Sequence, residues 1–217
     1  MTAQIAVIDY GGSNLRSVVK AIELVANRRA DVYIADSAAR LAQADRVVFP
    51  GQGAIGSCMS RLEASDWVGA IRECAESKPF LGICLGLQSL MTRSDEDGGT
   101  DCLNLFAGSV RHFTRNPPPA ADGTPQKIPH MGWNEVHWTR THPLLANIDS
   151  GRRFYFVHSF YVVPDDEQLT LGRTDYIDSF TSALAADNVF ASQFHPEKSA
   201  ADGLQLLTNF VGWNGQA

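Results

Sequence analysis

The chain has 217 residues, of which 44% are hydrophobic and 19% are charged, as is ordinary for a globular protein with a sizeable core. Its net charge of −6 comes without a basic block, so neither nucleic acid nor an anionic membrane is expected as a partner. No signal-peptide pattern opens the chain, and no apolar run approaches the roughly 18 residues of a membrane span. The four cysteines form no Cys-x-x-Cys pair, which favours free thiols in a cytoplasmic protein and no metal site.

Apolar runs and helical periodicity alternate in the first part of the chain. The runs that predict buried strands are Ile5–Ile8, Asp31–Ile34, Val47–Phe49 and Phe80–Ile83. Between the first two, apolar residues recur at i, i+3 and i+4 from Leu15 to Ala26, which predicts a helix capped by Ser13 or Asn14. This alternation is typical of a doubly wound, mostly parallel sheet with helices on both faces, so we expect a three-layer α/β fold.

The second half of the chain predicts antiparallel strands added to that sheet. Ser94–Thr100 and the Pro-rich stretch Asn116–Pro125 predict loops. The strand-like runs are Gly108–Phe113, Asn134–Trp138, Phe154–Val163, Ser182–Ala186 and Val189–Phe194. A turn at Asp187–Asn188 joins the last two. We therefore expect one domain over residues 1–217.

A last helix is predicted after Ser199. Ser199 is its expected cap, with Asp202 as the partner in a capping box. Its inward residues are Leu204, Leu207 and Phe210.

Cys84 lies where a predicted strand meets a predicted helix. It follows Phe80–Ile83 directly, and the apolar face of the helix contains Leu87, Leu90 and Met91. Gly82 and Gly86 flank it in the G-x-S-x-G pattern of a nucleophile elbow, with sulfur in place of oxygen. A helix N-terminus behind the sulfur would favour the thiolate. The pattern alone also fits a buried structural cysteine between glycines that allow close packing.

A catalytic thiol needs a base and a group that orients the base, and His195-Pro196-Glu197 offers both. In an extended segment, His195 and Glu197 project to the same side. The segment follows the run Val189–Phe194, so it and Cys84 are both expected at the carboxyl ends of strands. A surface histidine beside a helix N-terminus is the other interpretation. His158 lies on an apolar face and is expected to be a core histidine.

Pro50-Gly51-Gln52-Gly53 follows the third strand and can present backbone N–H groups to an oxyanion. The residues Gly51 to Gly56 also match G-x-G-x-x-G, the dinucleotide-binding pattern. Two features argue against that function: the pattern follows the third strand, and no acidic residue ends the next strand, Phe80–Ile83.

Four motifs in chain order resemble those of the class I glutamine amidotransferases. They are Pro50–Gly53, Gly82–Gln88, Val157–Phe160 and His195–Glu197. Within that family, Asp9–Leu15 and Pro129–Asn134 resemble the glutaminase subunits of imidazole glycerol phosphate synthases of histidine biosynthesis.

The resemblance implies a role for each matching residue. Cys84 attacks the side-chain amide of L-glutamine, and His195, oriented by Glu197, protonates the departing ammonia. The other implied contacts are the N–H groups of Gly53 and Leu85 on the oxyanion, and Gln88, His158, Ser159 and Phe160 on the amino-acid end of the substrate. No cofactor is implied.

The resemblance also implies a partner, a (β/α)₈ cyclase subunit in a heterodimer, because ammonia must reach the synthase without meeting water. The candidate interface residues are Trp133, Tyr155 and Lys198, with Trp138 divided between interface and core packing. Gating by the partner would rotate a peptide in Pro50–Gly53. Products would be imidazole glycerol phosphate and an aminoimidazole carboxamide ribonucleotide.

Three other functions compete with this one. The glutaminase subunit of a pyridoxal phosphate synthase should contain a Gly-Gly-Glu-Ser-Thr-like segment, which this chain lacks. A catalytically silent binding subunit of the same fold stays open on sequence alone. A cysteine peptidase is disfavoured because no secretion signal or pro-segment is recognised.

Overall fold

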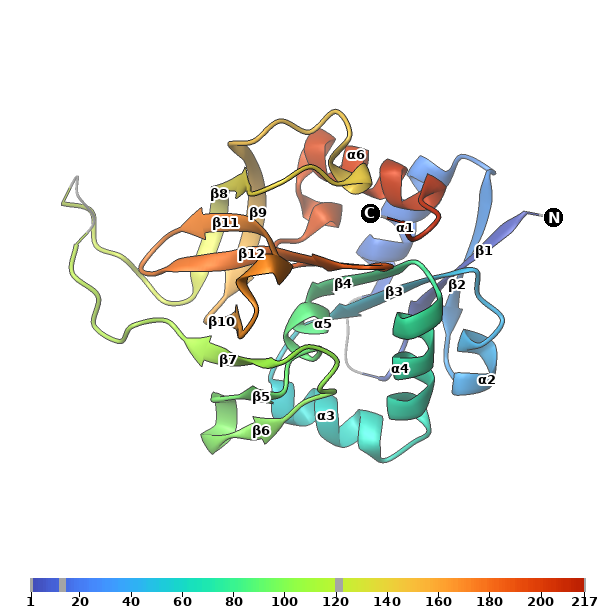
Figure 1. Cartoon of the computed structure of the whole chain (residues 1–217), viewed down its shortest axis with the longest axis horizontal. Coiled ribbons are helices and arrows are strands. Elements are labelled where there is room, and N and C mark those ends of the chain that lie inside the picture. The colour runs from blue at the N-terminus through green and yellow to red at the C-terminus, as the bar shows by residue number, and fades with distance from the viewer. Residues whose placement is uncertain (1, 12–14, 120–122, 217) are drawn as a thin grey trace.

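The computed structural model describes residues 2–11, 15–119 and 123–216, and its strands join one mixed sheet (Figure 1). The parallel part has the order β2-β1-β3-β4-β13. Its strands are β1 (Ala3–Ile8), β2 (Ala30–Ala35), β3 (Arg46–Gly51), β4 (Phe80–Cys84) and β13 (Val189–Ser192). Because β3, β4 and β13 run in the same direction, their carboxyl ends meet at one edge of the sheet.

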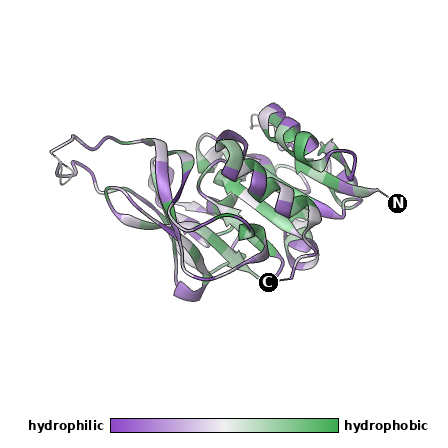
Figure 2. Ribbon diagram, turned by 90° about the horizontal axis from the view of Figure 1, so that it is seen from above, coloured by the Kyte–Doolittle hydropathy of each residue, from purple (hydrophilic) through white to green (hydrophobic). Residues whose placement is uncertain are grey.

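Helices cover both faces of the parallel strands, as predicted. One face contains α1 (Leu15–Ala26) and α6 (Ala200–Gly212). The other contains α2 (Ala38–Leu41), α3 (Ile55–Glu63) and α4 (Trp67–Ser77). The buried apolar residues form two clusters, one on each face, and the strands between them are hydrophobic (Figure 2). The expected three-layer α/β fold is confirmed.

The strands of the second half extend the sheet beyond β13, mostly antiparallel as predicted. The order continues β12-β10-β7-β5-β6, and β11, β8 and β9 branch from β12. Their bounds are β5 (Arg93–Ser94), β6 (Thr100–Asp101), β7 (Gly108–His112), β8 (His130–Trp138), β9 (Arg152–His158), β10 (Phe160–Pro164), β11 (Thr170–Asp175) and β12 (Ser179–Ala186). Single 3₁₀ turns lie at Glu96–Gly98, Pro143–Leu145, Glu167–Leu169 and Pro196–Lys198.

Two predictions for this half are wrong in detail. The run Phe154–Val163 is two strands, because the chain breaks at Ser159 between β9 and β10. Ser94–Thr100 is not all loop: β5 and β6 pair across it and enclose a 3₁₀ turn. Among the described residues, no helix is long and apolar enough to cross a membrane.

The predicted capping box of α6 does not form. Ser199 stands at the cap position, but its hydroxyl donates to the carbonyl of His195 at 2.6 Å and accepts from the N–H of Tyr155 at 3.0 Å. Asp202 pairs instead with Arg152 at 3.0 Å. Leu207 and Phe210 are buried, whereas Leu204 is only partly buried. The predicted caps of α1, Ser13 and Asn14, lie outside the described residues.

Candidate active site

Cys84 is the last residue of β4 and adopts a strained conformation, with φ +54° and ψ −105°. Non-glycine residues adopt such angles only where the surrounding structure enforces them, as at nucleophile elbows. The helix behind it, α5 (Leu85–Gln88), has a single turn, so the longer helix and the strong dipole expected from the sequence are absent from this part of the structure. The predicted apolar face is nevertheless buried, since Leu87, Leu90 and Met91 are fully inaccessible.

The two glycines of the elbow allow α5 to pack against neighbouring strands. A Cβ on Gly86 would overlap the carbonyl oxygen of Phe49 in β3. A Cβ on Gly82 would lie 3.0 Å from the Cβ of Ala191 in β13 and 3.2 Å from the backbone of Gly86. The atoms that a Cβ would crowd belong to β3, β13 and the first turn of α5. The glycines therefore fix where the sulfur stands relative to β3 and β13.

His195 and Glu197 form a buried pair beside Cys84. The Nδ1 atom of His195 lies 2.9 Å from Oε1 of Glu197, and both side chains are nearly inaccessible. The segment is not extended as predicted, because Pro196–Lys198 is a 3₁₀ turn that brings Glu197 back under the imidazole ring. The N–H of His195 donates to the carbonyl of Tyr155 at 2.9 Å, which attaches this turn to β9.

The groups next to His195 favour its protonated form. Burial alone would lower the pKa of His195, but the sulfur of Cys84 and the carboxylate of Glu197 raise it to about 10. The second ring nitrogen, Nε2, has no hydrogen-bond partner at normal geometry, and the Cys84 sulfur is the group close enough to act on it. The arrangement therefore favours an imidazolium between the Cys84 sulfur and the Glu197 carboxylate. Such an imidazolium can give its proton to a leaving group.

Gln193 is a residue of this site that the sequence analysis missed. It is fully buried, and its Nε2 atom donates to the sulfur of Cys84 at 3.6 Å. Its Oε1 atom accepts from Nε2 of Gln88 at 3.1 Å, and the same nitrogen of Gln88 donates to the carbonyl of Phe160 at 2.9 Å. The sequence signal for Gln193 was its position two residues before His195, because residues i and i+2 in an extended segment project to the same side.

A cavity of about 220 Å³ opens beside Cys84, smaller than the roughly 300–1,000 Å³ of sites for drug-sized ligands. It is lined by Gln52, Gly53, Cys84, Leu85, Gln88, Glu96, Pro129, Val157, His158, Ser159, Phe160 and His195. Every residue predicted for the oxyanion and the substrate is in this set. Glu197 is not, because it lies behind His195.

Glu96 also lines the cavity and was missed, because its segment was predicted to be a loop. Its Oε2 atom accepts the N–H of Ile55 at 2.9 Å, at the start of α3. Burial raises the pKa of this carboxyl, and the N–H of Ile55 opposes the rise. A half-buried carboxylate in a cavity of this size is suited to a small cation such as an ammonium group.

His158 supports the cavity from inside the core, as expected. Its Nδ1–H donates to the carbonyl of Phe160 at 2.8 Å, so Nε2 accepts from Nδ1–H of His130 at 3.0 Å. Burial lowers the pKa of His158 to about 3 and that of His130 to about 4, so both rings are neutral at pH 7. A neutral ring with both nitrogens occupied is not available as a base. It fixes the Phe160 carbonyl, which in turn fixes Gln88.

The three predicted interface residues lie together on the surface. The rings of Trp133 and Tyr155 are 6.2 Å apart at an edge-to-face angle, and the Lys198 ammonium lies 5.9 Å from the centre of the Tyr155 ring. Trp133 is 44% exposed and Met131, also on β8, is 62% exposed. Trp138 is partly buried and packs against Phe154 and Phe194 at the edge of the core.

Comparison with solved structures shows a shared fold. PurLQS from Thermotoga maritima matches with a TM-score of 0.72 and 19% identity, covering 98% of this chain and 99% of that one. A glutamine amidotransferase from Thermotoga maritima matches with a TM-score of 0.63 and 15% identity, covering 93% of this chain and 79% of that one.

Comparison with known sequences confirms the resemblance seen in the motifs. A protein of Nitrosococcus oceani named imidazole glycerol phosphate synthase subunit HisH is 52% identical over 213 residues, which cover 98% of this chain and 99% of that one. A protein of the same name from Hydrogenovibrio crunogenus is 50% identical over 213 residues, which cover 98% and 97%. The model of the class I glutamine amidotransferase domain matches residues 6–212. The chain therefore belongs to the class I glutamine amidotransferase family.

Proposed function

We propose that this chain is the glutaminase subunit of an imidazole glycerol phosphate synthase and that it supplies ammonia from L-glutamine to a synthase partner. The observation that supports the glutaminase chemistry is the strained Cys84 beside the buried His195–Glu197 pair, at a cavity the size of a small molecule. The assignment to imidazole glycerol phosphate synthase is supported by the names of relatives that are about 50% identical to this chain over nearly its whole length. The proposal treats residues 1–217 as one amidotransferase domain in the cytoplasm.

The proposed reaction begins when the Cys84 thiolate attacks the side-chain amide carbon of glutamine. The negative charge that develops on the amide oxygen is stabilised by the N–H groups of Leu85 and Gly53, which both line the cavity. Protonated His195 gives its proton to the amide nitrogen, so the carbon–nitrogen bond breaks and ammonia departs. The glutamyl group stays bound to Cys84 as a thioester. His195 then takes a proton from water, whose hydroxyl attacks the thioester and releases glutamate. Glu197 orients His195 throughout.

The amino-acid end of glutamine is placed by groups at the other side of the cavity. Gln88 and the segment His158–Phe160 were predicted for this role and line the cavity. We assign the α-ammonium group to Glu96, whose carboxylate is half-buried there. A carboxylate and an ammonium group form a charge-assisted hydrogen bond, which is stronger than one between neutral groups.

Glu96→Gln is expected to raise KM for glutamine about tenfold, with a smaller effect on kcat. The substitution keeps the shape of the side chain but removes its charge, and the ammonium group is bound equally in the ground and transition states. Steady-state kinetics with a saturating concentration of the partner measure the effects on KM and kcat separately. Asp97→Asn is the matched control, because it neutralises the neighbouring carboxylate, which does not line the cavity. An unchanged KM in Glu96→Gln removes Glu96 from the proposed site.

The partner is proposed to be a (β/α)₈ barrel that docks over the mouth of the site. Trp133, Tyr155 and Lys198 form a cluster of two aromatic rings and a cation, in which Tyr155 is half-buried and the other two are exposed. Aromatic residues are enriched at protein interfaces. Lys198 is next to Glu197, and Tyr155 accepts from the backbone of His195, so this cluster adjoins the catalytic pair. Ammonia released under such a cover would stay unprotonated and nucleophilic.

Reconstitution with a purified (β/α)₈ synthase subunit tests the proposal. The partner alone should synthesise product from ammonia only, and the mixture should do so from glutamine. The isolated chain should hydrolyse glutamine slowly, and the partner should accelerate this hydrolysis. Fast hydrolysis by the isolated chain contradicts the gating, and a mixture that uses only ammonia contradicts the assignment to this synthase.

A further inference from the structure

Gln193 has a fully buried side-chain amide that contacts the nucleophile of the proposed site. Its Nε2 atom donates to the sulfur of Cys84 at 3.6 Å, and no part of the residue is accessible to solvent. Cys84 lines the cavity but Gln193 does not, so the amide lies behind the sulfur, where a substrate in the cavity would not displace it. Burying an amide costs free energy unless its polar atoms are hydrogen-bonded, so the partners of this amide bear on its role.

The sheet places Gln193 next to Cys84. Ser192, the last residue of β13, pairs with Ile83 of β4. The next residues of these two parallel strands are Gln193 and Cys84, which are therefore neighbours. The backbone N–H of Gln193 donates to the carbonyl of Ser182 in β12 at 2.9 Å. The backbone of Gln193 is thus attached to the sheet on the side away from β4.

A chain of hydrogen bonds decides which atom of Gln193 faces the sulfur. The carbonyl oxygen of Phe160 can only accept, so the atom of Gln88 that lies 2.9 Å from it must be the nitrogen. This nitrogen also lies 3.1 Å from the side chain of Gln193, which must present its oxygen there, because two NH₂ groups would repel. The nitrogen of Gln193 is then left for Cys84. A backbone carbonyl therefore directs a hydrogen-bond donor toward the nucleophile.

A donor at this place favours the thiolate over the thiol. A neutral thiol is a weak acceptor, whereas a hydrogen bond to an ionised partner is roughly twice as strong. Electrostatic interactions are also stronger in a buried site than in water. His195 is close to the sulfur as well, but its Nε2 atom has no hydrogen-bond partner at normal geometry. Gln193, by contrast, makes a hydrogen bond to the sulfur at normal geometry.

We propose that Gln193 is a catalytic residue whose side-chain N–H stabilises the Cys84 thiolate. When the sulfur attacks glutamine, its negative charge passes to the amide oxygen of the substrate and this hydrogen bond weakens. When hydrolysis of the thioester releases glutamate, the charge returns to the sulfur and the hydrogen bond is restored. Gln193 thus acts on the reactive form of the free enzyme, whereas the oxyanion groups act on the substrate. The inference rests on the proposed function, in which Cys84 is the nucleophile.

Gln193→Met tests the inference, because methionine has a similar length and no N–H to donate. The rate at which iodoacetamide alkylates Cys84, followed by peptide mass spectrometry, reports the thiolate without glutamine or partner. The pH of half-maximal rate should rise by about one unit, the size expected for one hydrogen bond to a charged group. Well below that pH, alkylation should be about tenfold slower than in the wild type.

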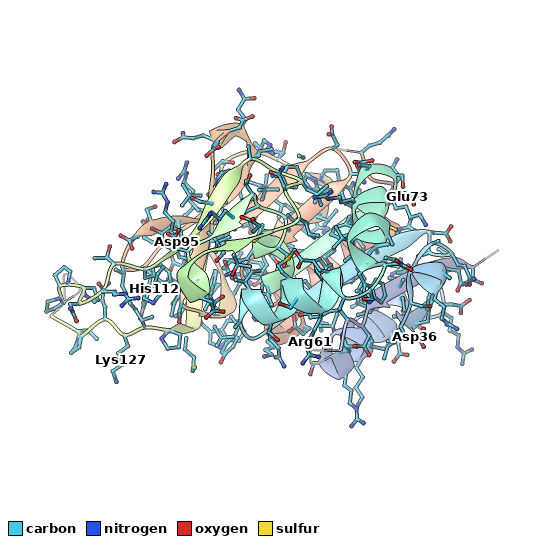
Figure 3. All side chains as sticks on the ribbon, turned by 90° about the horizontal axis from the view of Figure 1, so that it is seen from below. Asp36, Arg61, Glu73, Asp95, His112 and Lys127 are labelled. Carbon is cyan, nitrogen blue, oxygen red and sulfur yellow. The ribbon has the colours of Figure 1, made fainter. Side chains whose placement is uncertain are left out.

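Gln205→Met is the matched control. It removes a side-chain amide that donates to Oδ1 of Asn209 at 2.9 Å, on α6. Its alkylation profile should equal that of the wild type. Cys74 reports unfolding in every variant, because this thiol is buried on α4, next to Glu73 in Figure 3, and should stay unlabelled in a folded chain.

Gln193→Asn is the second variant, in case labelling of Cys74 shows that Gln193→Met does not fold. It keeps an amide but shortens the side chain by one carbon, so the N–H no longer reaches the sulfur and the same shift is expected. An unchanged pH of half-maximal alkylation in a folded variant overturns the role of Gln193. If the wild type hydrolyses glutamine while that pH is unchanged, only this inference fails. If the wild type hydrolyses no glutamine with its partner, the proposed function fails, and the alkylation profile still tests the bond to the sulfur.

Discussion

Cys84→Ala is expected to abolish glutamine hydrolysis, with a fall in kcat of at least about 10⁴-fold in the complex with the partner. The sulfur is the only group at the elbow that can form the thioester, and His195 and Glu197 have no substrate bond to act on without it. Labelling with a glutamine-analogue electrophile provides the second measurement. The wild type should lose one thiol per chain and the variant none.

Cys74→Ala is the matched control for that experiment. Cys74 is also a buried thiol, but it lies in α4, and burial raises its pKa so that it stays an unreactive thiol. This variant should keep both turnover and labelling. The partner should still make product from added ammonia in the presence of Cys84→Ala, which separates loss of glutaminase from loss of the complex. Glutamine-dependent synthesis that survives in Cys84→Ala would place the nucleophile elsewhere.

Gly86→Ala is expected to lower the free energy of unfolding by about 3 kcal/mol or more, near the upper end for overpacking a core. The added Cβ would overlap the Phe49 carbonyl, which is backbone in the middle of the sheet and cannot turn aside as a flexible side chain can. Either α5 moves away from β3 or β3 bends. Urea denaturation measures the loss, and the displacement of Cys84 should also slow its labelling.

Gly69→Ala shows whether that loss is specific to the elbow. Gly69 lies inside α4, and a Cβ there would meet nothing within 4 Å. Alanine at such a position is expected to raise the free energy of unfolding by about 0.5–1 kcal/mol, since glycine is the less favourable residue inside a helix. Equal effects from the two substitutions, or a Gly86→Ala variant as stable as the wild type, would show that the contact of α5 with β3 is not the constraint.

The parallel strands and the elbow were predictable because their signals are local. Runs such as Ile5–Ile8 and Phe80–Ile83 are apolar throughout, which is what a strand covered on both faces requires. The order β3-β4-β13 places the ends of three such strands at one edge, so residues far apart in sequence converge there. Family motifs then identified Cys84, His195 and Glu197. Their catalytic roles stay predictions until the variants are measured.

Glu96 was not predictable in the same way. Its segment is polar and rich in glycine, and a stretch of this kind without hydrophobic periodicity is predicted to be a loop. Its place at the cavity depends on the N–H of Ile55, which is 41 residues away in the chain. The same limit explains Ser199: the capping pattern is local, but the hydroxyl accepts from the N–H of Tyr155, which is 44 residues away and which only the tertiary fold brings within reach.

The side-chain amide of Gln88 bears on which forms of glutamine the proposed site accepts. Its nitrogen has two hydrogens, and both are hydrogen-bonded, one to the carbonyl of Phe160 and one to the side-chain oxygen of Gln193. Only its oxygen is left for a ligand, and an oxygen of this kind accepts but cannot donate. Free glutamine offers an α-ammonium group with hydrogens to give, whereas glutamine inside a peptide, or acylated at its nitrogen, has lost that charge and most of those hydrogens. The proposed site would therefore distinguish the free metabolite from glutamine residues of proteins by the charge and the number of donor hydrogens on the α-nitrogen, before any chemistry at the sulfur begins.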